Sequence, residues 1–589
     1  MVERGSVRFG GLRVTNMERS VRDQLREYAA LTRRGSEVFW SLVKRWFLVA
    51  ILVGLFVGLT VTVFERAVYV TWGYLLPRLT PVTVVLAPTL GLLLSGLCLQ
   101  YLTVNPEIHG TEEYIRAYHE RGGVVRFRSF PGKMLAAFST LAFGGSAGLE
   151  GPSIYAGSAI GSYLLRRMRR IGFTADDVRV LMVAGAAAGV SAVFKAPLTG
   201  IVFALEVPYR DDLARHALVP AMVSSVTSYL VLVQFLGVAP LFDVGGRYAP
   251  APVDLALALA LGLVIGLAGR LFVVSFEVFG RLMRRLPVPL WARTGLGGLV
   301  TGLFGLLSLS VLGQPAALGT GYESVGKLLG GQWAGWQALE LLVLKAGAVL
   351  ATLTSGAAGG IFIPLIVLGA SLGAALGGFV PGAGGALFPI VGMAAFLAAG
   401  YNTPIAATVF IAETTGGAGF IIPGLVAAAV AYVTAGRVSV SDQQRWRRES
   451  TLDQIMRARV GDIMTRDVVT VRSDETVKGF VTRKVPQHRH KSMPVVDDDG
   501  RLAGMIALTD VQSLPSERWA DVPLAELMRT DVLTAVPGTL VGELSRRMVE
   551  RDIDRVPVVD PADPGRIVGI ISDSDILGLE RMTSGTRPD

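Results

Sequence analysis

The most unusual chemical feature of the sequence is a single carboxylate in an otherwise apolar stretch. The stretch "GGSAGLEGPSIYAG" (144–157) places Glu150 among glycines, between long apolar runs. An unpaired charge in hydrocarbon is costly, so an acid in this setting indicates a functional site. Gly148 and Gly151 allow close approach to the backbone, and Pro152 suits the first turn of a helix. Glu150 is therefore predicted to lie at a helix N-terminus, where free N–H groups and the helix dipole attract negative charge.

A second stretch repeats this construction without the acid. In "GGIFIP" (359–364), Gly360 is followed by Ile361 and Phe362, so backbone N–H groups are the available polar partners. Two helix N-termini that converge from these stretches would bind an anion rather than a cation. The carboxylate of Glu150 would then compete with the anion until it is displaced or protonated.

The two stretches belong to an internal repeat. The segment 148–161 aligns with 360–373, and the segment 185–206 aligns with 392–413. The matched positions are Gly148 with Gly360, Pro152 with Pro364, Gly157 with Gly369, Gly161 with Gly373, Gly185 with Gly392, Pro197 with Pro404 and Glu206 with Glu413. Two related halves are typical of transporters whose substrate site lies near the bilayer midplane, at the repeat interface.

Glu206 and Glu413 end matched segments of the two repeats. Each could relay protons, set the charge of a vestibule, or act as a satisfied acid at a helix boundary. Because the position is duplicated, we expect the structural role.

Long apolar runs between about Phe47 and Tyr432 must position these residues. Several runs are shorter than the roughly 20 residues of a full membrane span. We therefore expect broken helices whose ends lie inside the protein, where irregular backbone is tolerated. The predicted helices are 47–63, 82–104, 133–143, 153–165, 180–193, 197–206, 217–236, 255–278, 296–312, 338–354, 364–376, 387–399, 404–413 and 421–435.

Charge and cysteine content restrict the function further. Basic residues cluster before the first apolar run and after the last one, which predicts that both termini are cytoplasmic. The net charge of +9 is dispersed, so no nucleic-acid partner is expected. Cys98 is the only cysteine, which excludes a disulfide framework and a thiolate metal site. No removable signal peptide is evident.

The C-terminal part has the composition of a soluble domain and is itself duplicated. The segments 460–471 and 492–511 resemble 524–535 and 555–576. Each copy predicts a short strand, a helix, two apolar strands joined by a polar turn, and a helix that begins near an Asp. This pattern resembles a tandem pair of CBS domains of α/β type. We expect a cytoplasmic segment at 1–45, a membrane domain at 46–445 and the CBS pair within 446–589, at about 453–515 and 520–581.

In the membrane domain, "GLEGP", "KAPLTGIVFALE" and "GGIFIP" resemble the signature segments of the CLC chloride channels and proton-coupled exchangers. The resemblance spans roughly Arg45 to Gln444. It implies an all-α polytopic membrane domain of two inverted repeats with broken helices. It also implies a homodimer in the cell inner membrane, with one chloride pathway per subunit and contacts near 197–206 and 404–413. By resemblance, Glu150 is the external gate, and the anion site includes Gly148, Gly151, Gly360 and the backbone N–H groups of Ile361 and Phe362.

The sequence departs from the family pattern at the inner end of the pathway. Proton-coupled members carry a second glutamate where this chain has Val207, although Glu206 or His216 could replace it. The family's Gly–Ser–Gly–Ile–Pro segment aligns here with His109 at the serine, Gly110 at the second glycine and Glu112 at the proline; its central tyrosine aligns with Ser441. These changes predict a wider or differently gated inner pathway, to which His109 adds a pH-sensitive charge. Alternatively, His109 merely bonds to the backbone at a helix start.

The CBS pair carries a nucleotide-binding signature of Gly, then Thr or Ser, then Asp. The second copy has Gly569, Ser572 and Asp575, whereas the first keeps Asp510 but has Ala507 in place of the hydroxyl. One site for ATP, ADP or AMP is therefore predicted, the alternative being a purely structural pair.

Together these features favour a voltage- or pH-gated chloride channel gated by Glu150. The alternatives are a proton-coupled chloride antiporter and a fluoride exporter. From other classes, the chain could be a nucleotide-sensing regulator with a vestigial pore, or a CBS-linked cation transporter, which would need more carboxylates. No enzymatic activity, metal site or required cofactor is predicted.

Overall fold

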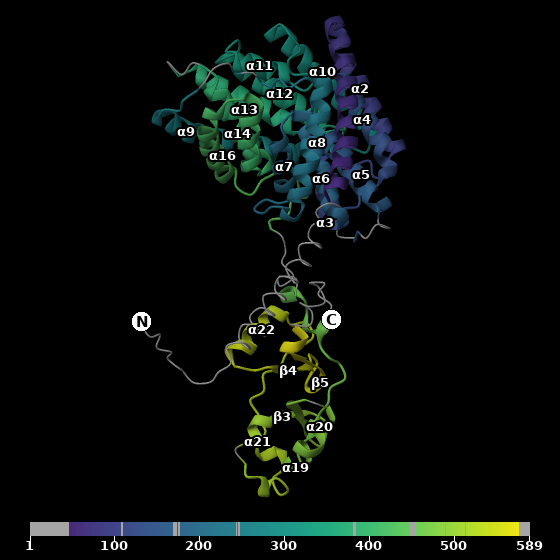
Figure 1. The fold of residues 1–589 in the computed structure, drawn as a ribbon, viewed down its shortest axis with the longest axis vertical. Helices are drawn as coiled ribbons and strands as arrows, with labels where there is room; N and C mark the ends of the chain where they lie inside the picture. The colour runs from purple at the N-terminus through teal and green to yellow at the C-terminus, as the bar shows by residue number, and fades with distance from the viewer. Residues whose placement is uncertain are drawn as a thin grey trace, which may run out of the picture. The chain divides into compact units, whose positions relative to one another are not determined.

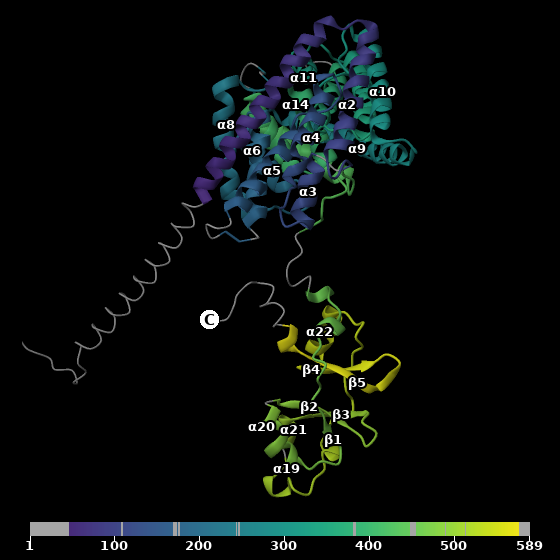
Figure 2. The same cartoon turned by 90° about the vertical axis from the view of Figure 1, so that its right-hand side faces the viewer.

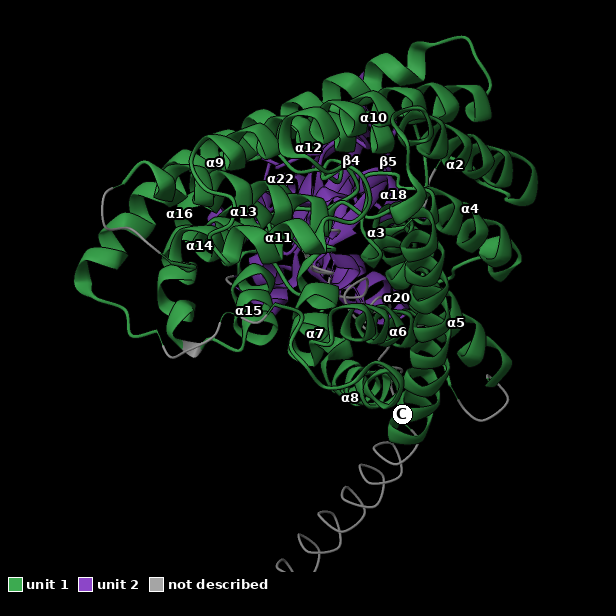
Figure 3. Cartoon of the chain, turned by 90° about the horizontal axis from the view of Figure 1, so that it is seen from above, with its two compact units in different colours: residues 1–447 green, residues 448–589 purple. Residues whose placement is uncertain are grey.

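The structure is a computed structural model that divides into two compact units, Met1–Arg447 and Arg448–Asp589 (Figure 3). It describes residues 46–107, 110–168, 173–174, 177–242, 244, 248–380, 385–447, 455–488, 490–512 and 514–576. Each unit is considered by itself.

The first unit is all-helical (Figures 1 and 2). A helical segment, Trp46–Arg78, precedes the labelled helices. The first half contains α2 (Pro81–Leu102), α3 (Thr111–Glu120), α4 (Phe130–Ala142), α5 (Glu150–Met168), α6 (Asp177–Phe194), α7 (Pro197–Glu206) and α8 (Leu218–Leu236). The second contains α9 (Pro252–Arg285), α10 (Leu290–Leu312), α11 (Tyr322–Leu329), α12 (Trp336–Thr354), α13 (Phe362–Gly378), α14 (Leu387–Tyr401), α15 (Pro404–Thr415) and α16 (Ile421–Ala435).

Within the described residues, seven helices are long and apolar enough to cross a membrane, while α7, α13, α14 and α16 are apolar but shorter. Leucines at a four-residue spacing, such as Leu263, Leu267 and Leu271 on α9, are exposed. Such a stripe on the outside of a bundle is suited to lipid rather than water. The expected mixture of full spans and short, buried helices is confirmed.

The two repeats fold alike. Helix α5 packs on α6 as α13 packs on α14, and α6 also contacts α7 and α8 as α14 contacts α15 and α16. Gly157 faces the carbonyl of Gly185 so closely that a Cβ would collide with it, and Gly369 faces Gly392 in the same way. Small residues at these crossings let the membrane helices approach through their backbones.

A backbone detail supports the same correspondence. Lys195 and Asn402, at matched positions after α6 and α14, both adopt the left-handed conformation, with φ of 51° and 56°. Few non-glycine residues adopt this conformation, so its duplication indicates that the two chain reversals are built in the same way.

Helices α7 and α15 lie side by side and cap each other (Figure 3). The carboxylate that ends α7, Glu206, accepts hydrogen bonds from the N–H groups of Ile405 (3.1 Å) and Ala406 (2.8 Å) in the first turn of α15. Glu413, near the end of α15, accepts from the N–H of Thr199 at 2.6 Å and from its hydroxyl at 2.7 Å, in the first turn of α7. The structural role expected for both acids is confirmed.

The second unit is the expected α/β pair. Its first copy contains α18 (Val460–Ile463), β1 (Val471–Arg472), α19 (Val477–Gly479), α20 (Val485–His488), β2 (Ser492–Val496), β3 (Leu502–Ala507) and α21 (Leu508–Val511). Its second copy contains α22 (Val541–Glu550), β4 (Arg555–Asp560) and β5 (Asp563–Ser572). Strand β2 pairs parallel with β1 and antiparallel with β3, and β4 pairs antiparallel with β5.

The two copies exchange backbone contacts. Thr465 of the first copy bridges to Ile570 of the second, and Arg529 of the second bridges to Met505 of the first. An exposed ion pair between Arg501 and Asp563 also joins them. Hydrogen bonding to the Arg501 guanidinium lowers the pKa of Asp563 from its ordinary value.

Candidate functional site

The repeats meet at a two-residue backbone bridge. The N–H of Gly148 donates to the carbonyl of Gly360, and the N–H of Gly360 donates to the carbonyl of Gly148, both at 2.8 Å. Helix α5 begins two residues after the first glycine, and α13 begins two residues after the second. The two helix N-termini are therefore adjacent, as the repeat alignment predicts.

Glu150 lies at this junction and is fully buried. Its Oε1 accepts a hydrogen bond from the N–H of Phe362 at 2.6 Å. Phe362 opens α13, so this N–H has no partner within its own helix. Among the described residues, Oε2 has no hydrogen-bond partner. The carboxylate thus occupies the kind of position that an anion would take at the start of α13.

The glycines around the acid leave it just enough room. A Cβ added to Gly148 or Gly360 would overlap the Glu150 carboxylate, and a Cβ on Gly151 would lie 3.0 Å from Gly360. Gly110, with φ of +65°, places a third segment here, since its Cβ would lie 3.4 Å from Gly151. Three chain segments therefore meet beside Glu150 through their backbones.

Aromatic rings surround the ring of Phe362 and make its environment apolar. Its ring centroid lies 4.7 Å from that of Phe194, 4.9 Å from Phe203 and 5.1 Å from Phe410. In such an apolar shell, electrostatic interactions are stronger than in water, and an unpaired charge is correspondingly costly. The N–H groups at the start of α13, which have no partner within the helix, can compensate an anion for its lost hydration.

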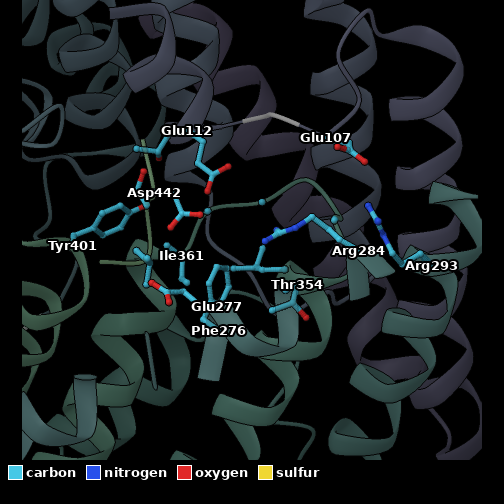
Figure 4. Close-up of a pocket in the computed structure, with 18 residues that line it drawn as sticks. Glu107, Glu112, Phe276, Glu277, Arg284, Arg293, Thr354, Ile361, Tyr401 and Asp442 are labelled. Atoms are coloured by element: carbon cyan, nitrogen blue, oxygen red, sulfur yellow. The ribbon is translucent and has the colours of Figure 1, made fainter. Parts of the chain in front are cut away.

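A cavity of about 140 Å³ reaches this junction from one side (Figure 4). Gly360, Ile361 and Ser441 line it. Other lining residues bear charges or hydroxyl groups, namely Glu107, Thr111, Glu112, Glu277, Arg284, Arg293, Thr354, Tyr401 and Asp442.

Two buried hydroxyl groups of the cavity wall have no hydrogen-bond partner among the described residues, Thr111 Oγ1 and Ser441 Oγ. Unsatisfied buried hydroxyls are uncommon in proteins, and both are free to contact an anion or a water molecule. Ser441 therefore lies where the sequence alignment places it, although its contact with an anion stays a prediction.

Most of the predicted anion-site residues come together. Those that lie at the junction or in the wall of its cavity are Glu150, Gly148, Gly151, Gly110, Gly360, Ile361, Phe362 and Ser441. Val207 is buried just after α7, where its carbonyl accepts a hydrogen bond from Gln444 Nε2 at 3.0 Å. His109 lies outside the described residues, so its proposed role stays a prediction.

Sequence reasoning missed Tyr401, which ends α14 and lines the cavity. Its ring lies 5.4 Å from that of Phe203 and 6.5 Å from that of Phe362. The repeat alignment contains a signal for it, because Tyr401 is the counterpart of Phe194, which packs on the other side of Phe362.

In the second unit, the predicted nucleotide-binding residues lie at the ends of strands. Asp575 Oδ2 accepts from both the N–H (2.8 Å) and the hydroxyl (2.7 Å) of Ser572, where β5 ends. Asp510 accepts from the N–H of Ala507 at 2.9 Å and pairs with Arg529. Ser572 and Asp575 therefore form a hydrogen-bonded pair that a phosphate or ribose could contact. Asp510 is instead paired with the guanidinium of Arg529.

Known proteins share these features. The family model described as voltage gated chloride channel matches residues 91–436, and the CBS domain model matches 460–517 and 524–581. A ClcB-like protein of Ralstonia nicotianae, named as a chloride channel protein, is 33% identical over 358 residues, which cover 59% of this chain and 82% of that protein. The H+/Cl− exchange transporter ClcA of Salmonella typhimurium is 32% identical over 340 residues, which cover 54% of this chain and 67% of that protein.

Among solved structures, that of a CLC-type fluoride/proton antiporter matches with a TM-score of 0.59 and 25% identity, covering 69% of this chain and 98% of the other. The family match spans more than half of the chain, and it includes both halves of the junction at Glu150. The protein therefore belongs to the voltage gated chloride channel (CLC) family, and it carries two CBS domains after its membrane unit.

Proposed function

We propose that the protein exchanges chloride for protons across the membrane, with Glu150 as the group that both gates the anion and carries the proton. The observation that carries this proposal is the hydrogen bond from the Phe362 N–H to the buried Glu150 carboxylate. The names of the similar proteins support it, because ClcA is an H+/Cl− exchange transporter and the structural neighbour is a fluoride/proton antiporter.

The exchange follows from competition for one set of N–H groups. The ionised carboxylate and an anion cannot both occupy the start of α13, since two negative charges would repel each other at close range. Protonation removes the charge of Glu150 and frees the N–H of Phe362 for the anion. A cycle in which the acid leaves protonated and returns ionised would therefore move protons against chloride.

A passive chloride channel is the second candidate, and the sequence by itself favours it because Val207 stands where proton-coupled relatives carry an acid. The comparisons support the exchanger better than the channel, since the named functions of the similar proteins include proton exchange. Whether chloride or fluoride is the preferred anion is tested by the same assay with each salt.

The test is a flux measurement in proteoliposomes under opposed chloride and proton gradients. For the exchanger, an outward chloride gradient drives protons inward, and the reversal potential depends on both ions. Glu150→Gln should abolish proton movement, because glutamine cannot take up a proton at this position. Glu340→Gln, at an exposed acid on α12, is the matched control and should behave as wild type. A wild-type reversal potential that follows chloride alone would support the channel.

Assembly and orientation complete the proposal. A homodimer contact through α7 and α15 is supported by Leu198 and Ile405, matched apolar residues that are 56% and 47% exposed. The distribution of basic residues supports cytoplasmic termini in the inner membrane of the cell. The arrangement of Ser572 and Asp575 supports an adenine nucleotide site in the CBS pair.

A further inference from the structure

Proton exchange requires a route by which protons reach the buried Glu150 from the inner side. The position that serves this purpose in proton-coupled relatives is filled by the buried, apolar Val207. The neighbouring acid, Glu206, is already engaged with the first turn of α15. A different group must therefore supply the proton, if the proposed exchange holds.

The cavity at the junction is rich in acids. Its wall carries the carboxylates of Glu107, Glu112, Glu277 and Asp442, against the guanidinium groups of Arg284 and Arg293. Arg293 is buried and donates to the carbonyl of Ser355 at 2.9 Å. An excess of carboxylates repels chloride and attracts protons, so this wall suits a proton entry better than a simple anion funnel.

Glu112 is the carboxylate best placed to pass a proton on. It lies in the first turn of α3, two residues after Gly110, whose backbone reaches Gly151 beside the gate. It lines the cavity together with Asp442 and Arg284. Among the described residues, its carboxylate makes no hydrogen bond or ion pair, so its protonation breaks no structural contact.

Solvent reaches the other side of this acid. Asp442 is exposed and precedes Arg447, the last residue of the membrane unit, by five positions. In Figure 4, Glu112 and Asp442 lie at the same end of the cavity as Tyr401, while Glu107 and Arg293 lie at the opposite end. Protons from water can thus reach Glu112 past Asp442.

Hydroxyl groups lie in the same cavity wall as Glu112. Tyr401 and Thr111 line the cavity together with Glu112. The ring of Tyr401 lies 6.5 Å from that of Phe362, whose N–H bonds to Glu150. A hydroxyl accepts a proton on its lone pair and donates its own, so it can pass a proton on without a net change. The unpartnered Thr111 Oγ1 offers a second such group in the same wall.

We propose that Glu112 is the inner proton carrier of this transporter, delivering protons to Glu150 through Tyr401, Thr111 and water in the cavity. The proton leaves hydronium in the inner solution, binds the Glu112 carboxylate, and passes along the hydroxyl groups to the Glu150 carboxylate. Each hydroxyl regains the proton that it gives up. The groups that set the charge around Glu112 are Asp442, Glu277, Glu107, Arg284 and Arg293. This inference rests on the proposed exchange.

The test compares proton and chloride fluxes of full-length variants in proteoliposomes. Glu112→Gln should lose proton movement driven by a chloride gradient, to the level of protein-free liposomes, while chloride still moves; Glu112→Asp should restore part of the coupling. Glu340→Gln, which removes an exposed carboxylate on α12 outside this cavity, should keep the wild-type proton-to-chloride ratio. Equal ratios for wild type and Glu112→Gln would overturn the inference and leave the exchange proposal intact.

A second variant tests the route independently of the folding of the Glu112 variants. Tyr401→Phe keeps the ring contacts with Phe203 and Phe362 but removes the hydroxyl. It should lower the proton-to-chloride ratio, and an unchanged ratio would overturn the route through Tyr401. If wild type itself moves no protons against chloride, the proposed exchange fails, and that outcome is distinct from a failure of Glu112 alone.

Discussion

Glu150 and the glycines beside it form a space in which one carboxylate fits and little else does. The carboxylate accepts a hydrogen bond from the N–H of Phe362. The absence of side chains at Gly148 and Gly360 leaves room for its two oxygens. A charge-assisted hydrogen bond of this kind contributes about 1.5–3 kcal/mol. The same position can therefore be held by the acid or yielded to an anion at modest cost.

At this scale, Gly360→Ala should push the carboxylate away from the Phe362 N–H, because the new Cβ overlaps it. Loss of that hydrogen bond should lower the occupancy of the α13 N-terminus by the acid roughly tenfold or more. Chloride flux measured against pH should then depend less steeply on pH than in wild type. Gly326→Ala on α11 is the control, since its Cβ meets no atom within 4 Å. A wild-type pH profile for Gly360→Ala would contradict this account of the gate.

Among the elements, α7 and α15 show how short membrane helices are stabilised. Each begins with a proline and exposes backbone N–H groups that lipid cannot satisfy. The carboxylate at or near the end of each helix supplies the acceptors for the other, through Glu206 and Glu413. Side-chain acceptors at a helix N-terminus contribute about 0.5–2 kcal/mol each, and here they also fix the two repeats to each other.

We expect Glu413→Ala to lower the midpoint of thermal unfolding in detergent, with a loss of about 1–2 kcal/mol, because the first turn of α7 loses its acceptors. Glu413→Gln retains one acceptor oxygen and should lose less. Glu340→Ala, at an exposed position on α12, should unfold at the wild-type temperature. Equal midpoints for all three variants would show that the reciprocal caps do not stabilise the fold.

In the whole molecule, a membrane unit and a CBS pair share one chain, and the second unit has its own hydrophobic core. The CBS copies are tied together by exchanged backbone bridges and by the Arg501–Asp563 pair. A nucleotide that contacts Ser572 and Asp575 would bind within this unit.

For the full-length protein, titration calorimetry with ATP, ADP and AMP should show binding of at least one nucleotide. Asp575→Ala should abolish the binding heat, because it removes the group that Ser572 contacts. Asp499→Ala, in the exposed turn between β2 and β3, should bind as wild type. No binding heat from wild type would indicate that the CBS pair is purely structural.

The membrane character, the internal repeat and the place of the acid at the junction of the repeats could all be predicted from the amino-acid sequence. These features are local. An apolar run, a glycine at a helix crossing or a proline in a first turn favours the same local structure whatever the rest of the fold. Matched glycines and acids, such as Gly157 with Gly369 and Glu206 with Glu413, also indicated that the two halves of the membrane unit are related. The tandem CBS pair was readable for the same reason.

The residues around the cavity beside Glu150, by contrast, could be identified only from the folded chain. Tyr401, Thr111, Glu112 and Asp442 are distant in sequence or lie in segments without a local signature, and they meet because three chain segments and α14 converge on one cavity. Local periodicity carries no information about such a convergence, since it depends on how the helices cross. The acid missing at Val207 was visible in the sequence, whereas the carboxylate proposed to replace it emerged only once the chain was folded.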